Sequence, residues 1–438
     1  MTVASIEEAR KAIERKEYLN AESIYIQLLT PDSNLRIDKQ VDLQESAILE
    51  LGELYQLEQN ESKLLDLIEK SRKIMSGSFA KSKSAKIIKS LLDIVENTHQ
   101  WENQTLEGSI DLTIKVNQEC IDWAIDEKRS FLRQSLQIRS ANLYYKKKYF
   151  QDSLKIINEL LTEFKKLDDK SSLVDVQLLE CKNYFQLKNF AKSKAALTSA
   201  RTSANSIYCP SSIQAELDLM SGILNAQDND FKTAYSYFYE SFENYQIKSK
   251  KDKENNFEDL KSMKVLKYML LCKIMIGNID EVNQILKQKN VQQFISKRDI
   301  EAMKNVSVAY KNRSLKELED CLKNYNNELT LDVIIRSHLS DLYDSLFQQN
   351  LLKLIEPYSI IEINHICAMI GLSKNIIESK LSNMILDKVF YGVLDQGNGW
   401  LIIYDEPKRD ETYDLALDVV KHMSDAVDAL YEKAGELD

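Results

Sequence analysis

The feature that most constrains the fold of this chain is an internal repeat. One pattern recurs four times: an apolar stretch, one or two polar residues, a large apolar residue, and a small residue that opens the next apolar stretch. Successive large residues lie 41, 41 and 48 positions apart, a period slightly longer than the ~34 residues of tetratricopeptide (TPR) hairpins. The large residues are Tyr149, Phe190, Phe231 and Ile279, and the small ones are Ser153, Ser193, Ala234 and Val282.

Each repeat is predicted to be a hairpin of two amphipathic helices. Leu154, Ile157, Leu161 and Phe164 lie at helical spacing and share one face. A single hairpin cannot cover that face, whereas stacking on the next hairpin buries it. The expected fold is therefore all-α, a right-handed TPR-like helical solenoid. Small residues such as Gly222 and Ala234 are expected to let paired helices approach.

The limits of the array are predicted from its polar segments. Glu17–Ala21 repeats the same turn, so the array is expected to begin near the N-terminus. Residues 30–42, 98–109 and 247–259 are polar and are predicted to be loops.

Composition supports long helices and excludes several classes of protein. The 438 residues include 10 Gly and 4 Pro, too few for the turns of a large β protein. The net charge of −10 argues against a protein whose main task is to hold phosphates. The six cysteines stand alone, none in a CxxC pair, which indicates buried thiols in a reducing compartment.

The same sequence predicts a location in the cytoplasm and nucleus. No apolar stretch reaches the ~18 residues of a membrane span, and Met1–Arg10 lacks a signal-peptide core. No membrane partner is expected.

The pattern changes after about residue 350. A β-rich stretch, Tyr358–Ile363, follows Pro357, and two helices are predicted next, Asn364–Ile370 with Asn364 as N-cap and Ser373–Asp387. Two apolar runs, 389–396 and 400–404, flank Gly397-Asn398-Gly399 and predict a hairpin. Strand, helix, turn, helix and hairpin together make a winged helix.

Nucleic acid is not an expected partner of this winged helix. Between Val389 and Pro407 there is no Lys or Arg, whereas Asp395, Asp405 and Glu406 are present. Because phosphate contacts dominate affinity for DNA, an acidic wing disfavours duplex binding.

The hairpin instead suggests a protein interface. Val389, Tyr391, Val393 and Trp400 alternate along it, and a small core covers only one face of a hairpin. The alternative, that these residues merely fill the winged-helix core, stays open at this point.

No enzymatic site is predicted. The histidines, His99, His338, His365 and His422, lie far apart and form neither HxH nor HExxH. No Gly-rich phosphate loop is present, and Asp168-Asp169 is surrounded by lysines. We therefore expect no catalytic residue, no metal and no cofactor.

Helical repeats that run into a winged helix are similar to the PCI family, named after the proteasome lid, the signalosome and a translation initiation factor. The residues that carry this resemblance are Ala309-Tyr310, Asn312–Leu315, Ser337–Leu339, Asn350-Leu351, Ile355–Tyr358, Met384–Lys388 and Gly392–Gly397. Further segments resemble the non-ATPase subunit 6 family of the proteasome regulatory-particle lid: Ser46–Gly52, Glu163–Lys170, Ala204–Pro210 and Leu266–Met275.

The resemblance divides the chain into four parts. Residues 1–225 would be the TPR-like solenoid, 226–350 the helical part of the PCI domain and 351–405 its winged helix. Residues 406–438 would be a C-terminal helix, from about Thr412 to Ala434, that joins a bundle of lid subunits.

The same resemblance implies a non-catalytic scaffold of the 26S proteasome lid in ubiquitin-dependent protein degradation. Its partners would be other PCI subunits of the lid, the neighbourhood of the lid deubiquitinase, the core-particle α-ring and the ATPase ring. A PCI scaffold of the signalosome or of the initiation factor is the alternative. The solenoid would brace the regulatory particle against the core, through exposed charged turn residues that meet no neighbouring repeat. The candidates are Lys146, Lys147, Lys188 and Asp230.

Overall fold

The structure is a computed structural model of the whole chain. It describes residues 8–13, 15, 17–29, 37–58, 60–78, 81–99, 106–249, 256–330, 332–370, 373–405 and 411–435. The chain divides into two compact units, Met1–Leu266 and Lys267–Asp438, and each is described by itself. The four-part division at residues 225, 350 and 405 stays a prediction.

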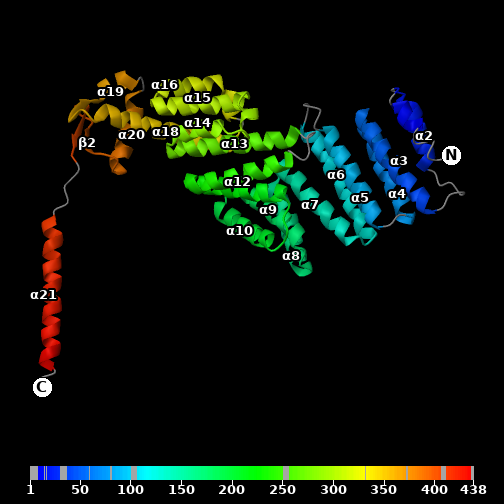
Figure 1. Cartoon of the computed structure of the whole chain (residues 1–438), viewed down its shortest axis with the longest axis horizontal. Coiled ribbons are helices and arrows are strands. Elements are labelled where there is room, and N and C mark those ends of the chain that lie inside the picture. Colours follow the sequence, from blue (N-terminus) through cyan, green and yellow to red (C-terminus); the bar gives the residue numbers. More distant parts are fainter. Residues whose placement is uncertain are drawn as a thin grey trace. The chain divides into compact units, whose positions relative to one another are not determined.

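The first unit is built of helices that stack in sequence order (Figure 1). Residues 8–13 are helical, and Ala9 and Ala12 are buried together with Ala21 and Tyr25 of the next helix, so the array begins near the N-terminus as expected. The later helices are α2 Tyr18–Leu29, α3 Ile37–Leu57, α4 Glu61–Ser78, α5 Lys81–His99, α6 Leu106–Asp126, α7 Ser130–Lys146, α8 Phe150–Leu167, α9 Lys170–Gln186, α10 Phe190–Asn205, α11 Ser211–Gln227, α12 Phe231–Ser249 and α13 Asn256–Ile276, whose last ten residues belong to the second unit.

Helices extend further into the three polar stretches than the sequence predicts. Residues 37–42, 98–99, 106–109, 247–249 and 256–259 are helical, so the loop prediction is wrong for them, and the remaining residues of these loops lie outside the described ones. In α3 the reason is packing: Val41 is buried and belongs to the same core as Ile48. Burial of one apolar side chain per turn stabilises a helix whatever its surface polarity.

The small residue after each repeated turn closes its hairpin. Ser153 and Ser193 are fully buried, and their hydroxyls donate to the carbonyls of Ala141 at 2.8 Å and Cys181 at 3.0 Å on the partner helix. In the α11–α12 hairpin the residue after the turn, Ala234, is also fully buried. On the helix before that turn, Gly222 leaves room for Phe238, whose ring would lie 2.6 Å from a Cβ atom there. These residues hold the two helices of a hairpin closer than a larger side chain permits.

Left-handed backbone recurs at regular intervals in the turns. Lys128, Lys148, Asp168 and Lys188 stand twenty residues apart, with φ values of 52°, 67°, 52° and 58°. Asn229 and Gly277 hold the same conformation in later hairpin turns. Each such residue ends one helix and reverses the chain, and the residues other than Gly277 do so at a cost that a glycine does not incur.

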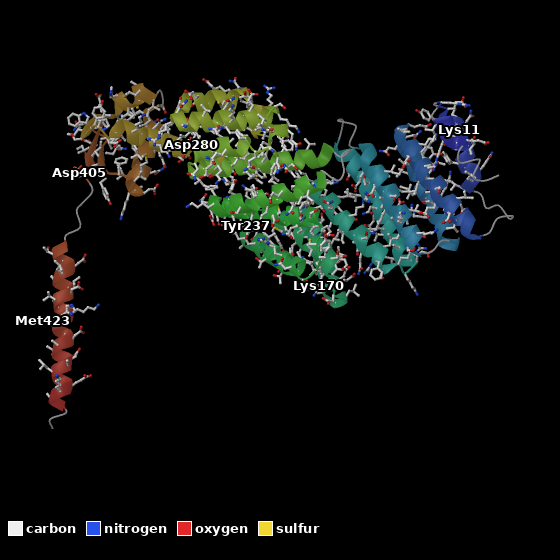
Figure 2. All side chains as sticks on the ribbon, viewed as in Figure 1. Lys11, Lys170, Tyr237, Asp280, Asp405 and Met423 are labelled. Carbon is white, nitrogen blue, oxygen red and sulfur yellow. The ribbon has the colours of Figure 1, made fainter. Side chains whose placement is uncertain are left out.

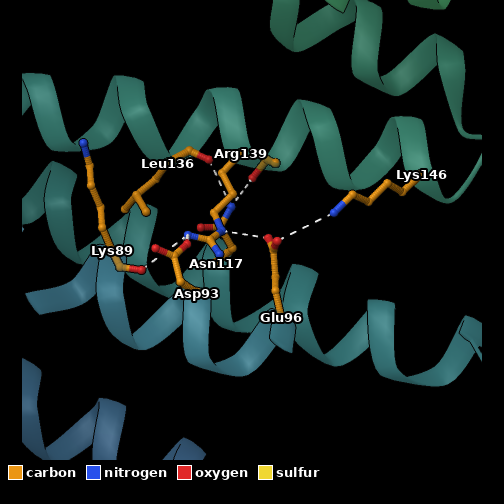
Figure 3. Close-up of polar contacts among 8 residues, drawn as sticks. Lys89, Asp93, Glu96, Asn117, Leu136, Arg139 and Lys146 are labelled. Atoms are coloured by element: carbon orange, nitrogen blue, oxygen red, sulfur yellow. Dashed lines mark hydrogen bonds and ion pairs between the residues drawn. The ribbon is translucent and has the colours of Figure 1, made fainter. Parts of the chain in front are cut away.

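Charged side chains add contacts between successive helices. Figure 3 shows Arg139 of α7 reaching back to α5, where its guanidinium lies 2.8 Å from both Asp93 and Glu96. Lys146 also approaches Glu96, at 3.6 Å. Asn117 of α6 donates to the carbonyl of Leu136 and to the hydroxyl of Ser140, which ties α6 to α7.

The second unit continues with helices and ends in a small sheet and a last helix. Its helices are the end of α13, α14 Ile279–Leu286, the short 3-10 helix Gln292–Phe294, α15 Arg298–Asn312, α16 Leu315–Asn324, α17 Asn326–Thr330, α18 Val333–Ile355, α19 Ile363–Ile370, α20 Lys374–Leu386 and α21 Glu411–Gly435. The strands β1 Ile360–Glu362, β2 Tyr391–Asp395 and β3 Trp400–Tyr404 form an antiparallel sheet of order β1-β3-β2.

Strand, two helices and hairpin make the predicted winged helix. Its core joins Ile361 and Leu401 of the sheet to Ile377 and Leu381 of α20, all buried, and α18 closes it with Phe347. One detail of the prediction is wrong: Asn364 is not the N-cap, because α19 already begins at Ile363 and the Asn364 amide donates to Glu362 at 3.1 Å. The all-α solenoid that ends in a winged-helix module is confirmed.

Candidate functional site: an open sheet face and an exposed helix

The register of the sheet sorts its side chains onto two faces. Val393 pairs with Ile402, Tyr391 with Tyr404, and Ile360 of β1 with Ile402 from the other side. Because directly paired residues point to the same face, these side chains share one face with Trp400. Leu401 and Ile361, on the opposite face, are the ones that enter the winged-helix core.

The first face is open and mostly apolar, with the carboxylates of Glu362 and Asp395 beside Trp400. Val393 is 50 % exposed, Trp400 46 % and Tyr404 54 %. The interpretation that the predicted residues fill the core is therefore wrong for Val393 and Trp400. Val389, 43 % exposed, precedes β2, and Tyr391 is half-buried on the open face. An apolar, aromatic surface on a rigid sheet is the kind of surface that proteins use to bind one another.

Strand β2 adds a backbone edge to this surface. It pairs with β3 on one side, and the strand order leaves its other side at the border of the three-stranded sheet. A further strand of another chain can pair there through main-chain hydrogen bonds.

The turn that joins β2 to β3 is held by one carboxylate. The Asp395 side chain accepts from the backbone N–H of Gly397 at 3.0 Å and from the Asn398 amide at 2.9 Å. These hydrogen bonds, first that of the Asn398 side chain, lower the pKa of Asp395. Gly399 completes the turn with φ +72°. A turn of defined shape fixes the register that sets Trp400 on the open face.

Sequence reasoning missed three apolar members of this face. Ile402 and Tyr404 follow Trp400 at period two, so the alternation along the strand was enough to find them. The alternation does not predict that Ile360 belongs to this face. Its position depends on the pairing of β1 with β3, and both helices of the winged helix lie between these strands in the sequence.

Helix α21 exposes a second apolar surface. Figure 2 shows its side chains standing out around the helix, with Met423 labelled. Val420, Met423, Val427 and Leu430 are each more than 60 % exposed and follow one another at steps of three, four and three residues. That spacing is the a/d pattern of a coiled-coil seam, so α21 has the pattern of one helix of a helix bundle.

The four charged turn residues have different surroundings. Lys147 forms an ion pair with Asp111 of α6 and lies 4.5 Å from the Tyr149 ring centre, and Lys146 lies near Glu96 of α5. The expectation that these two lysines meet no neighbouring repeat is therefore wrong. Lys188 is exposed and has no ion-pair partner among the described residues. Asp230 caps α12, with its carboxylate 2.6 Å from the Thr233 hydroxyl.

A buried carboxylate stands out within the solenoid. Asp218 of α11 is 1 % exposed, lies 3.4 Å from the guanidinium of Arg201, and accepts from the Gln214 amide at 3.2 Å. Burial outweighs these contacts and raises the pKa of Asp218 to about 6. Two residues away, Glu216 also experiences burial, but Lys182 and Lys261 hold its pKa at about 2. Helix α11 thus has one well-compensated carboxylate and one poorly compensated carboxylate, which point to different sides of the helix.

The described residues contain neither a metal cluster nor a membrane helix. No three His, Cys, Asp or Glu side chains within the described ranges are placed to hold a metal ion. No helix within those ranges is long and apolar enough to span a membrane. His338 is buried and His365 is exposed.

Comparison with known protein families covers both units. The N-terminal domain of 26S proteasome regulatory subunit RPN6 matches residues 2–147, the PCI domain matches 322–405, and the C-terminal helix domain of subunit RPN6 matches 409–435. The chain is 49 % identical to 26S proteasome regulatory subunit RPN6 of Saccharomyces cerevisiae, over 99 % of both chains. The chain belongs to the RPN6 family.

Relatives in distant organisms extend this finding. The chain is 45 % identical to the probable subunit rpn6 of Schizosaccharomyces pombe, over 98 % of this chain and 97 % of the relative. It is 42 % identical to the 26S proteasome non-ATPase regulatory subunit 11 homolog of Arabidopsis thaliana, over 91 % of this chain and 90 % of the relative. The PCI-domain match includes the winged helix, and the match to the RPN6 C-terminal helix domain includes α21; these two elements carry the exposed apolar surfaces.

Proposed function

We propose that this chain is a non-catalytic structural subunit of the 26S proteasome lid. It scaffolds lid assembly through its PCI module and serves ubiquitin-dependent protein degradation in the cytoplasm and nucleus. The observation that carries the proposal is the similarity over nearly the full length to subunits named as 26S proteasome regulatory subunits. The same similarity disfavours the signalosome and the initiation factor as the parent assembly.

The open sheet face, with the free side of β2, is the proposed joint to other PCI subunits of the lid. Val393 and Trp400 lie in its exposed part, and their loss leaves the winged-helix core intact because that core uses Leu401 and Ile361. Helix α21 supplies the second joint, in which its exposed seam is buried in a helix bundle. Apolar side chains on both elements lose water on assembly, which is favourable at about 25 cal/mol per Å².

The test is a reconstitution of the lid with the variant Val393→Asp/Trp400→Glu. We expect the folded variant to be left out of the assembly, because buried unpaired carboxylates oppose association. Val333→Asp is the matched control, since Val333 is 78 % exposed on α18, outside the sheet. Normal incorporation of the folded double variant would contradict a joint at this face.

The solenoid is proposed to brace the regulatory particle against the core-particle α-ring and the ATPase ring. Lys148 and Lys188 end α7 and α9, which are antiparallel to the helix between them, so both lie at the same end of the hairpins. Because single surface ion pairs are weak, several must act together. We expect Lys148→Glu/Lys188→Glu to weaken the association of an assembled lid with the core, more so at low salt where charge matters most.

The matched control reverses two charges at the other end of the same helices. Lys166 and Lys170 are exposed beside the α8–α9 turn, so Lys166→Glu/Lys170→Glu changes the net charge equally. Equal effects of the two variants would argue against a contact at the Lys148 and Lys188 end. Lys147 is kept intact, because its reversal would also break the pair with Asp111.

The absence of catalysis is part of the proposal. The purified chain is expected neither to cleave a fluorogenic ubiquitin ester nor to hydrolyse ATP above a buffer blank. Turnover of either substrate that persists through repeated purification would refute it.

A further inference from the structure

A pocket of about 370 Å³ lies in the second unit, apart from the open sheet face. Three elements surround it: the turn before α16, the C-terminal part of α18 and the end of α19. Its lining residues are Arg313, Ser314, Leu315, Asn350, Lys353, Leu354, Met369 and Ile370. Neither the exposed sheet residues nor α21 contribute to it.

Half of the lining is apolar. Leu315, Leu354, Met369 and Ile370 come from three different helices, and Leu315 and Ile370 are supported from behind by the winged-helix core. Met369 is 51 % exposed, although it stands on a short helix whose other face is buried. The volume is enough for one large aliphatic or aromatic side chain, and such a side chain would cover Met369.

The charged residues of the pocket all have one sign. They are Arg313 and Lys353, both positive, and no described lining residue is Asp or Glu. Neither cation has an ion-pair partner among the described residues, in a chain whose net charge is −10. The ten-residue helix α16 begins at Leu315 beside them, and the partial positive charge of its N-terminus has the same sign.

Arg313 is held in place by a strained turn. It has φ 49° and ψ 39° as the C-cap of α15, and its backbone N–H donates to Tyr310 at 3.1 Å. Ser314 then caps α16, where its hydroxyl accepts from the backbone of Glu317. Two consecutive caps fix the backbone of Arg313 between the helices, so its side chain starts from a defined point on the rim.

Other pockets of the chain differ in charge. In the pocket of α2, α3 and α4, Lys63 lies 2.8 Å from Glu22 and both line the cavity. In the pocket of α4 and α6, Arg72 lies 2.8 Å from Glu119. Lys63 and Arg72 are paired with carboxylates that line the same pockets, whereas Arg313 and Lys353 have no ion-pair partner among the described residues. A ligand complementary to this pocket therefore carries negative charge.

We propose that this pocket binds an acidic peptide segment of another protein, in which one Leu, Phe or Met is flanked by Asp or Glu. The large side chain fills the apolar floor over Met369, and the flanking carboxylates pair with Arg313 and Lys353. Arginine suits this task, because its planar fork binds a carboxylate through two hydrogen bonds. A purely apolar partner would leave two cations desolvated and unpaired, which is unfavourable.

The experiment selects peptides from a random twelve-residue display library on the immobilised full-length chain. We expect the enriched sequences to contain a large apolar residue with acidic neighbours. One enriched peptide, labelled with fluorescein, is then titrated with the chain by fluorescence anisotropy. Its Kd is expected to rise at least tenfold with Arg313→Glu/Lys353→Glu and with Met369→Asp, and severalfold between 50 and 300 mM salt.

Two further variants serve as controls for this experiment. Lys304→Glu/Lys323→Glu makes the same change of charge at exposed positions outside the pocket and is expected to leave Kd within twofold. Arg313→Gly removes the guanidinium while suiting the left-handed backbone, so it keeps the fold and should still weaken binding. The proposal would be overturned if the enriched sequences lacked acidic residues, or if no sequence were enriched above the bare support. It would also be overturned if Arg313→Glu/Lys353→Glu bound the peptide as tightly as the unchanged chain.

Discussion

The helical hairpin α11–α12 and the strand hairpin β2–β3 both depend on aromatic side chains, but in opposite ways. Phe238 of α12 is 2 % exposed and lies against Gly222, where no other side chain fits. Trp400 of β3 is 46 % exposed, and the fold keeps its core on the other face of the sheet. In one region aromatic surface stabilises the fold, and in the other it stays available for binding. The difference predicts different responses to the same substitution.

The largest expected effect is that of Phe238→Ala. Removing a buried ring leaves a cavity, so the free energy of unfolding should fall by about 3 to 5 kcal/mol. Trp400→Ala should lower it by less than about 1 kcal/mol. Urea unfolding followed by circular dichroism measures both. If the two variants lost equal stability, the distinction between the regions would not hold.

A second test adds a group instead of removing one. Gly222→Ala places a methyl group 2.6 Å from the Phe238 ring, so we expect a loss of about 1 to 3 kcal/mol from overpacking. Gly435→Ala is the control, since a Cβ there meets nothing within 4 Å. In the double variant Gly222→Ala/Phe238→Leu the smaller side chain makes room, and part of the loss should be recovered. Additive losses would show that the contact is not the cause.

A third test concerns Asp218, a buried carboxylate of α11. Because burial raises the pKa of Asp218 from its ordinary value of 3.8 to about 6, the ionised carboxylate destabilises the folded chain at neutral pH. Asp218→Asn should therefore stabilise the chain by about 1 to 2 kcal/mol at pH 7.5.

The pH dependence checks the cause of that gain. A raised carboxyl pKa contributes stability below the unfolded value near 3.8 and loses it as the pH rises through about 6. The advantage of Asp218→Asn should thus shrink between pH 6 and pH 4 in thermal unfolding. A gain that is constant with pH would point to packing and not to charge.

The smallest expected effect lies in the turns. Lys188 has φ 58°, a conformation that favours glycine, so Lys188→Gly should raise the free energy of unfolding by up to about 1 kcal/mol. Lys192→Gly, four residues on and inside α10, should lower it by about as much. Both variants replace Lys by Gly. Opposite changes in the free energy of unfolding would confirm that the backbone conformation of the site determines the effect. If Lys188→Gly lowered the free energy of unfolding, the left-handed backbone at Lys188 would not be strained.

The same contrast explains what sequence reasoning predicted. The hairpins followed from spacing, because Ser153, Ser193 and Ala234 recur at nearly equal steps and each is fully buried beside the preceding helix. The winged helix followed from local turn chemistry around Gly397–Gly399. Both signals are short-range, so a linear pattern contains them.

Features that depend on distant partners were not predicted. The ion pair of Lys147 with Asp111 crosses from α7 to α6, and the place of Ile360 depends on its pairing with Ile402. The cationic pocket is assembled from α16, α18 and α19, and none of its residues forms a motif by itself. The start of α19 at Ile363 was missed because burial of Ile363 in the core overrides the capping preference of Asn364.

The strand order β1-β3-β2 also affects how this chain emerges from a ribosome. The last strand to be synthesised is the middle one, so β1 and β2 have no partner until residues 400–404 have left the exit tunnel. Until then Ile361 and the apolar faces of α19 and α20 lack the side chain of Leu401 that covers them. A premature stop codon just before Trp400 therefore prevents the whole sheet from forming, although most of the chain has already been made.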